Sequence, residues 1–160
     1  AGIARSEHVT DVSVEQYRTM MAVNVDAGFF LAQRAIPHLL ETSGSIVNIA
    51  SNAGLMGQAY TVAYCMTKGA VIQFTKALAM EYVKTGLRIN AIAPGGVDTP
   101  LTHNFSIPPD VDFALMQPYM GMRPMASADE VAALFAFVAS DEARSIHGSI
   151  LSIDNGLTAS

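Results

Sequence analysis

The sequence predicts an α/β fold in which helices pack against a parallel β-sheet. Short apolar segments rich in Ile, Val and Ala alternate along the chain with longer segments whose apolar residues recur at helical spacing. Hydrophobic residues make up 51% of the 160 residues and charged residues only 14%, which suits a chain with a substantial buried core. Strands that alternate with helices, without a repeat or a linker, are typical of parallel βαβ units, so we expect a single domain over residues 1–160.

The first predicted helix runs from about Val14 to about Leu40. Ser13 and Gln16 match a capping box at its start, and the apolar residues that follow recur at roughly helical spacing. Pro37 lies near the end of this segment, where the loss of an amide donor does the least damage.

Three short segments are predicted to be strands and two further segments to be helices. The strands are 45–50, 87–93 and 149–153, and the first two are apolar on both faces, as in a buried parallel strand. The helices are 62–83, which ends just before Gly86, and the segment that begins at a capping box of Ser127 and Glu130 and runs to about Ala139.

Charge and hydropathy argue against two classes of partner. The chain has 9 Lys and Arg residues against 14 Asp and Glu, a formal net charge of -5, and no basic cluster that could follow a nucleic-acid backbone. The longest apolar run, 132–139, is too short to span a bilayer. Cys65 is the single cysteine, so no internal disulfide can form, and we expect a cytoplasmic protein. The His residues lack metal-ligand spacing, so no metal site is expected.

Polar side chains follow the predicted strands, at the sheet edge where open parallel sheets bind ligands. Ser51 follows the first strand, and residues 94–99 follow the second. Tyr64 and Lys68 are four residues apart on the next helix and therefore share a face. A neighbouring cation favours the phenolate form of a Tyr and so makes proton exchange possible near neutral pH. Ser51 can donate a hydrogen bond to a substrate oxygen held beside that phenol.

These residues, in this order and spacing, resemble the short-chain dehydrogenase/reductase family over essentially the whole chain. The segment from Ser45 to Ser51, with Tyr64-Cys-Met-Thr-Lys68 after it, is similar to the family's Ser and Tyr-x-x-x-Lys motif. Further matches are Val23-Asn24-Val25 on the first helix, Arg88-Ile-Asn-Ala-Ile-Ala-Pro94-Gly95-Gly96-Val97-Asp98-Thr99-Pro100 at the cofactor turn, Asp154-Asn-Gly156 near the end, and Ala1-Gly2 as the tail of an Asn-Asn-Ala-Gly motif.

The resemblance implies a catalytic role for four residues. Tyr64 would be the general acid in reduction and the general base in oxidation, while Lys68 would lower the pKa of Tyr64 and bind the nicotinamide ribose. Ser51 would polarise the substrate oxygen, and Asn24 would hold a water that connects Lys68 to solvent. The cofactor-binding residues implied are Gly2, Tyr64, Lys68, Pro94, Gly95, Val97 and Thr99.

The resemblance also implies a Rossmann-type three-layer fold with NAD or NADP as cofactor. The family's Thr-Gly-x-x-x-Gly-x-Gly turn, which binds the cofactor phosphates, has no counterpart in this sequence. We therefore expect the chain to be the C-terminal two-thirds of the family's domain and the function to belong to the complete protein. The residue that selects NAD or NADP would lie in the missing part, so this choice stays open.

Residues 101–125 correspond to the family's variable substrate loop, which we expect to be irregular because Pro108-Pro109 and Gly121 interrupt it. The loop is rich in Met and aromatic residues, which favours an apolar carbonyl or alcohol substrate, such as a steroid, a terpenoid or another lipid-like molecule. A 3-oxoacyl thioester reductase is the alternative within the class, and a noncatalytic binding or scaffold module is the alternative outside it. Apolar residues around both long helices favour a homo-oligomer, and the resemblance implies a tetramer.

Overall fold

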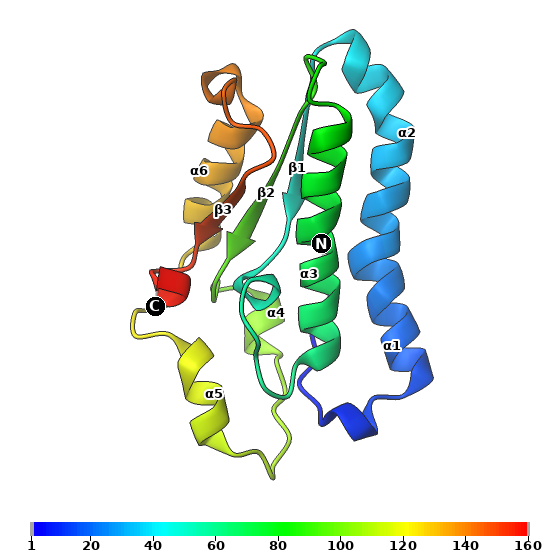
Figure 1. Cartoon of the computed structure of the whole chain (residues 1–160). Coiled ribbons are helices and arrows are strands. Elements are labelled where there is room, and N and C mark those ends of the chain that lie inside the picture. The colour runs from blue at the N-terminus through cyan, green and yellow to red at the C-terminus, as the bar shows by residue number, and fades with distance from the viewer. Residues whose placement is uncertain (1, 160) are drawn as a thin grey trace.

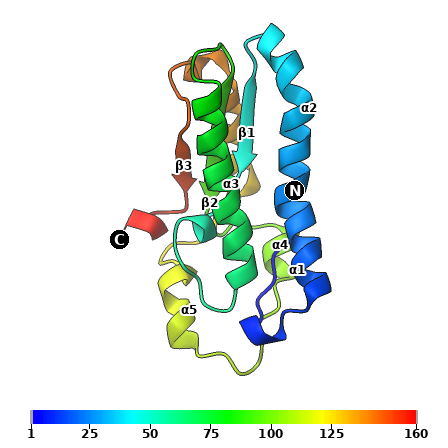
Figure 2. The same cartoon turned by 45° about the vertical axis from the view of Figure 1, so that its right-hand side comes forward.

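The computed structural model describes residues 2–159, and its centre is a parallel sheet of three strands in the order β1-β2-β3. The strands are β1 (Ser45–Ile49), β2 (Arg88–Pro94) and β3 (Ile150–Ile153). Ser45 pairs with Arg88 and Ala91 pairs with Ile150, so all three strands end at the same edge of the sheet. Helices cover both faces, as Figures 1 and 2 show: α2 (Ala27–Glu41) and α3 (Val62–Glu81) on one, α6 (Ala128–Ala139) on the other. The predicted α/β fold with a parallel sheet is confirmed.

The first predicted helix is a continuous helical rod with an irregular turn inside it. α1 (Val14–Met21) passes into the π-helical turn η2 (Ala22–Asp26), which passes into α2. The Ser13 capping box is present, since the Ser13 hydroxyl accepts from the Gln16 amide and the Gln16 side chain accepts from the Ser13 amide. Single π-helical turns inside helices often occur at functional sites, which draws attention to Asn24 in the middle of this one.

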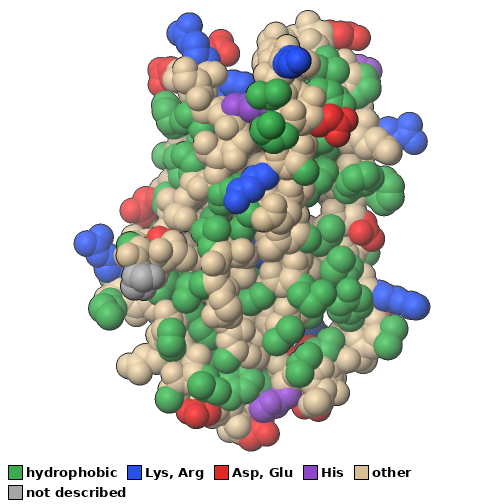
Figure 3. All heavy atoms as spheres, in the orientation of Figure 1, with side chains coloured by type: hydrophobic (Ala, Val, Ile, Leu, Met, Phe, Trp, Pro, Cys, Tyr) green, Lys and Arg blue, Asp and Glu red, His purple; other side chains and the backbone are tan. Residues whose placement is uncertain are grey.

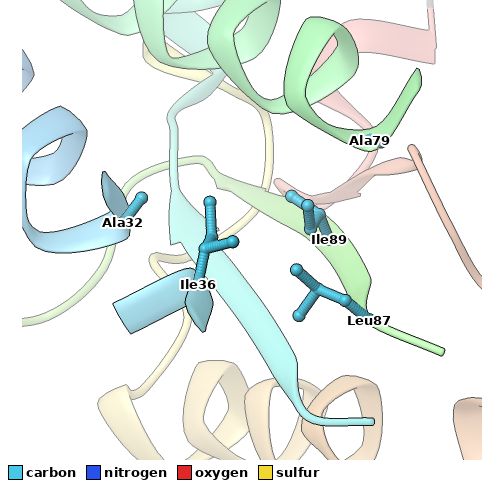
Figure 4. Packing of buried hydrophobic residues seen from close by; sticks show 5 residues of the cluster. All are labelled: Ala32, Ile36, Ala79, Leu87 and Ile89. Atoms are coloured by element: carbon cyan, nitrogen blue, oxygen red, sulfur yellow. The ribbon is translucent and has the colours of Figure 1, made fainter. Parts of the chain in front are cut away.

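The core lies mainly between the sheet and the helices α2 and α3. Its main cluster consists of Ala32, Ile36, Ala79, Leu87 and Ile89, which face one another in Figure 4. All seven residues of β2 are buried, as predicted, because strands pair with both of its edges. The expectation that β1 is equally buried is wrong: its residues are only half-buried, since within residues 2–159 no strand pairs with its outer edge.

The first residue of β2 also connects the sheet to α6. Arg88 is 9% exposed, and its guanidinium donates to the carbonyls of Val138, Ala139, Ser140 and Ala143 at 2.8 to 3.3 Å. A cation at a helix C-terminus pairs with carbonyls that have no partner within the helix. Arg88 therefore fixes α6 against the second face of the sheet.

The segment 101–125 is more regular than predicted. It contains most of α4 (Pro100–His103) and all of α5 (Phe113–Met120), which lies beyond the carboxyl ends of the strands in Figure 1. The side chain of Asp112 accepts from the amide of Ala114 and so caps α5, and the helix ends at Gly121, whose φ is 74°. Within the described residues, no helix is long and apolar enough to cross a membrane.

Candidate active site

A cavity of about 460 Å³ opens at the carboxyl ends of β1 and β2. All the predicted site residues except Asn24 line it, namely Gly2, Ser51, Tyr64, Lys68, Pro94, Gly95, Val97 and Thr99. They come from segments that are far apart in the sequence and meet because the parallel strands end at one edge. Ala1, the other residue of the predicted Ala1-Gly2 match, lies outside the described residues.

Ser51 is the residue in which β1 turns into the short 3₁₀ helix η3 (Asn52–Gly54). Its hydroxyl accepts from the amide of Ala53 at 3.1 Å and donates to Oδ1 of Asn52 at 3.1 Å. Its one proton can serve either Asn52 or the phenolate of Tyr64, so the hydroxyl must turn away from Asn52 to stabilise that phenolate. Only 7% of Ser51 is exposed, so its hydroxyl is held in place at the wall of the cavity.

Tyr64 and Lys68 lie one turn apart on α3, with Nζ of Lys68 5.7 Å from the centre of the Tyr64 ring. Lys68 is only 4% exposed, and its ammonium donates to the carbonyl of Ile49 at 2.9 Å. Burial lowers the pKa of Lys68 to about 8, because desolvation disfavours the charged form. Burial also raises the pKa of Tyr64, and the hydrogen bond from Ser51 opposes this rise without cancelling it.

This balance differs from the expectation that Lys68 sets the pKa of Tyr64. The largest influence on the phenol is its own burial, and the influence that favours phenolate is the Ser51 hydrogen bond. The Lys68 ammonium lies over the Tyr64 ring, 5.7 Å from its centre, and donates to the carbonyl of Ile49. The residues therefore provide a phenol that holds its proton beside a hydroxyl that can stabilise its anion.

Asn24 lies behind the cavity wall, where it is 7% exposed. Its Oδ1 accepts from the amide of Ile3 at 2.9 Å, and its Nδ2 donates to the carbonyl of Ile3 at 2.8 Å and to Oγ1 of Thr67 at 3.1 Å. Both N–H groups of the carboxamide are thus in use, so the water implied by the resemblance would have to donate to Oδ1 or to the backbone. The observed contacts instead fix the segment that brings Gly2 and Ala4 to the cavity.

Two glycines allow the elements around the cavity to approach each other closely. A Cβ on Gly54 would lie 2.7 Å from the backbone carbonyl of Lys68, so only glycine lets η3 rest against this turn of α3. A Cβ on Gly95 would lie 2.9 Å from Cα of Asp154, where β3 ends beside β2. The relative positions of Ser51, Lys68 and the turn after β2 depend on these close contacts.

The turn after β2 provides a wall suited to a planar polar ring such as nicotinamide. Gly96 and Asp98 exchange backbone hydrogen bonds with Ala126, which holds Val97 in a short parallel bridge. The hydroxyl of Thr99 donates to the carbonyl of Val97 at 3.3 Å. Backbone amides and hydroxyls at the edge of a cavity are the groups that can recognise a carboxamide, so these residues fit the predicted cofactor.

Several residues that sequence reasoning did not assign to the site also line the cavity. They are Ala4, Ile49, Ala50, Asn52, Gln58 and Thr61. Asn52 could have been found, because it directly follows Ser51 at a strand end. Gln58 could not, since it reaches the cavity through a loop whose path has no periodic pattern in the sequence.

The substrate loop contributes fewer apolar residues to the cavity than its composition suggested. Among the Phe, Tyr, Ile, Leu and Met residues of 105–125, only Phe105 and Tyr119 line it. Met116 is 2% exposed and belongs to the buried core, whereas Met120 is 62% exposed and does not line the cavity. The loop is tied back by Tyr119, which donates to the carbonyl of Ala59 at 2.7 Å.

Comparison with known proteins agrees with this geometry. Residues 1–158 match the family model described as enoyl-(acyl carrier protein) reductase. The chain is 37% identical over 160 residues to meso-2,3-butanediol dehydrogenase of Serratia marcescens, covering 100% of this chain and 62% of that protein. It also superposes on 4-hydroxyisoleucine dehydrogenase complexed with NADH and succinate, with a TM-score of 0.85, 32% identity, and coverage of 100% of this chain and 66% of that one.

A further solved structure, ElxO with NADP bound, has a TM-score of 0.85 at 32% identity and covers 100% of this chain and 65% of that one. The chain thus spans less than two-thirds of the length of these relatives. The match of the family model over nearly all of the sequence, together with these identities, shows that the chain belongs to the short-chain dehydrogenase/reductase family.

Proposed function

We propose that the protein carrying this chain is an NAD(P)-dependent oxidoreductase that interconverts a secondary alcohol and a carbonyl compound. The observation that carries the proposal is the meeting of Ser51, Tyr64 and Lys68 in one cavity beside the turn 94–99. Relatives of this chain named as dehydrogenases act on alcohols, and solved neighbours contain NADH or NADP. The resemblance in sequence and the arrangement in space thus support the same chemistry.

In carbonyl reduction Tyr64 would donate its phenolic proton to the substrate oxygen, and in alcohol oxidation the phenolate would take the hydroxyl proton. Ser51 would donate a hydrogen bond to that oxygen and hold it beside the phenol. Lys68, buried next to Tyr64, would bind the ribose of the cofactor and favour the phenolate when its ammonium is turned toward the site. When bound, the nicotinamide supplies or accepts the hydride.

The residues that would hold the nicotinamide half of the cofactor are those of the cavity wall. They are Gly2, Tyr64, Lys68, Pro94, Gly95, Val97 and Thr99. Nothing in this wall distinguishes NAD from NADP, because the two differ at the adenosine ribose and not at the nicotinamide.

The apolar part of the cavity supports a substrate with an apolar body. Leu101, Phe105 and the ring of Tyr119 form this wall. The alternative substrate, a 3-oxoacyl thioester, would use the same proton-transfer residues, but its carrier protein calls for a basic docking patch. On the face shown in Figure 3, most Lys and Arg side chains stand apart from one another, so this face offers no such patch.

We also propose that the protein is a homo-oligomer, in keeping with a tetramer. The outer faces of α1, α2 and α3 expose large apolar side chains, among them Phe29 at 46%, Phe30 at 58% and Met66 at 50%. Figure 3 shows many hydrophobic side chains over the face that carries these helices. Contiguous exposed apolar surface is typical of a subunit interface. Light scattering at micromolar concentration tests this proposal, and a monomeric mass would contradict it.

The lone Cys65 supports a reducing compartment such as the cytoplasm.

The decisive experiment on the enzymatic proposal measures cofactor binding and turnover in the full-length protein. Thermal stabilisation by NADH or NADPH should appear, because a ligand that binds the native state raises its stability. With NAD+ or NADP+ supplied in place of the reduced form, reduced cofactor should form when a secondary alcohol is added. Failure to bind either dinucleotide would instead support the noncatalytic binding module.

A further inference from the structure

Two carboxamide side chains line the cavity next to the proposed proton-transfer residues. Asn52 directly follows Ser51 and is only 6% exposed, and Gln58 is half-buried in the loop between η3 and α3. Neither residue has a role in the mechanism proposed above. Both are nevertheless connected to it, because Oδ1 of Asn52 accepts from the Ser51 hydroxyl at 3.1 Å and from Nε2 of Gln58 at 3.3 Å.

Each of these side chains has one polar atom left over. Nδ2 of Asn52 and Oε1 of Gln58 make no hydrogen bond to any residue between 2 and 159. Among residues 2–159, the fully enclosed side-chain atoms that lack a hydrogen-bond partner are the hydroxyls of Ser6 and Ser45. Nδ2 of Asn52 is not one of them, so it is not sealed inside the protein. Because neither atom is enclosed, a ligand that occupies the cavity can reach both of them.

The two free atoms have complementary chemistry. The Asn52 amide nitrogen is a donor, and the Gln58 carbonyl oxygen is an acceptor. A hydroxyl group can accept from the first and donate to the second at the same time, whereas a carbonyl could satisfy only the donor. A methyl or methylene group in this position would leave both unsatisfied.

Resting on the proposed oxidoreductase function, we propose that Asn52 and Gln58 bind a second hydroxyl group of the substrate. The pair would thus select diols and hydroxyketones in which this hydroxyl lies next to the reacting carbon. The adjacency follows from the chain itself, because the Asn52 carboxamide that binds Gln58 also binds the Ser51 hydroxyl that would hold the reacting oxygen. The apolar wall of Leu101 and Phe105 would contact the rest of the molecule.

The reaction remains the two-electron step of the proposed function. The C–H hydride of one carbinol carbon passes to the nicotinamide, its O–H proton passes to the Tyr64 phenolate, and that carbon becomes a carbonyl. The second hydroxyl stays unchanged and acts as the recognition group. The product of a vicinal diol is then a hydroxyketone.

The experiment compares cis-1,2-cyclohexanediol with cyclohexanol, which share the carbon ring and differ by one hydroxyl. In the full-length protein, Gln58→Met keeps the length of the side chain and removes its hydrogen bonds. We expect kcat/KM for the diol to fall by about 10-fold to 100-fold, the usual loss when a hydroxyl loses its partners, while kcat/KM for cyclohexanol changes by less than about threefold. Gln33→Met, at an exposed position of α2 outside the cavity, is the matched control and should change neither value.

The outcomes separate this inference from the proposed function. An equal loss for both substrates would show that Gln58 only braces Asn52, and no change for either would show that it does not contact the substrate; both results overturn the inference while alcohol oxidation stands. Absence of cofactor reduction with both substrates in the parent protein would overturn the proposed function and the inference with it. A fall in kcat/KM for the diol alone would support both the proposed function and this inference.

Discussion

Nδ2 of Asn24 donates a hydrogen bond to Oγ1 of Thr67 at 3.1 Å and so joins the π-helical turn η2 to the helix α3. The hydroxyl of Thr67 is 2.8 Å from the carbonyl of Tyr64, to which it donates in turn. Thr67 itself is 1% exposed. The buried hydroxyl of Thr67 therefore joins two turns. One is η2, which fixes Ile3, and the other is the turn of α3 that carries Tyr64 and Lys68.

Replacing this hydroxyl should destabilise the protein. Thr67→Val keeps the shape of the side chain but leaves an N–H of Asn24 facing a methyl group, and we expect the free energy of unfolding to fall by about 1 to 3 kcal/mol. Thr67→Ser retains the hydroxyl and should recover most of this loss. Urea unfolding of both variants measures the difference, and equal stabilities would show that the hydrogen bond contributes nothing.

Tyr64→Phe should remove nearly all turnover and leave dinucleotide affinity within about threefold of the parent. The phenolic proton is needed only in the reaction, whereas the ring that packs in the cavity is retained. Steady-state kinetics gives kcat, and the quenching or enhancement of cofactor fluorescence gives the affinity. Turnover within about tenfold of the parent would contradict the assignment of Tyr64 as the proton-transfer group.

The rate of alcohol oxidation should rise with pH. Because burial raises the pKa of Tyr64, the phenol keeps its proton at neutral pH, and the phenolate needed for oxidation becomes available only as pH increases. The rate of carbonyl reduction should fall over the same range. Ser51→Ala removes the hydrogen bond that holds the pKa of Tyr64 down, so it should displace the rise in kcat/KM to higher pH as well as slow the reaction. An unchanged pH profile would show that Ser51 does not tune the phenol.

The buried ammonium of Lys68 should lower the stability of the cofactor-free protein at neutral pH. Burial lowers the pKa of Lys68 from 10.5 to about 8, so between these values the unfolded chain holds a proton that the folded chain has lost. Stability therefore rises with pH across this window, and below it the folded protein bears a cost of about 3 kcal/mol for the buried cation. Lys68→Met removes this cost and loses one hydrogen bond to Ile49, worth about 1 kcal/mol.

We therefore expect Lys68→Met to be more stable than the parent at about pH 7, with an advantage that shrinks toward about pH 10. Urea unfolding at several pH values measures this difference, in which the titration of groups common to both proteins cancels. A constant difference across the range would show that the pKa of Lys68 is not lowered in the folded state. Activity should be lost at every pH.

Phe105→Ala should reduce kcat/KM for bulky apolar alcohols more than for small ones. The ring lines the cavity, and the loss of a buried apolar contact is worth about 1 to 3 kcal/mol, or roughly 5-fold to 150-fold in kcat/KM. Met120→Ala is the matched control, since Met120 is exposed on the same loop and lies outside this cavity. Kinetics on a series of alcohols of increasing size measures the effect. Similar losses for Phe105→Ala and Met120→Ala would place the apolar recognition elsewhere.

The regular elements were predictable where local signals agree with the tertiary structure. The capping residues Ser13 and Ser127 mark the helix starts correctly, because their side chains satisfy backbone amides that belong to the same turn. The apolar pattern also predicts a buried strand at 87–93, which the structure places at Arg88–Pro94. In each case the determining contacts lie close in the sequence or depend only on apolar periodicity.

The features that were missed depend on contacts between distant residues. Nothing in the residues Ala22–Asp26 requires a π-helical turn, which accompanies the hydrogen bonds of Asn24 to Ile3 and Thr67. The pKa of Tyr64 likewise follows from burial, which spacing on a helix does not reveal. The positions of Ser51 and Lys68 at one edge of the sheet were predictable, because the topology of parallel strands determines them. The position of Gln58 in the cavity wall was not predictable.

The complete burial of β2 means that the two sides of the cavity differ in their tolerance of mutation. The turn 94–99 leaves directly from a strand that is paired on both edges, so a substitution there is transmitted to the core. The segment 101–125 touches the same cavity through a few side chains at the periphery. If the proposed function holds, substitutions in the loop would change substrate preference while the strand end keeps the cofactor wall in place, so libraries aimed at new substrates should be confined to the loop.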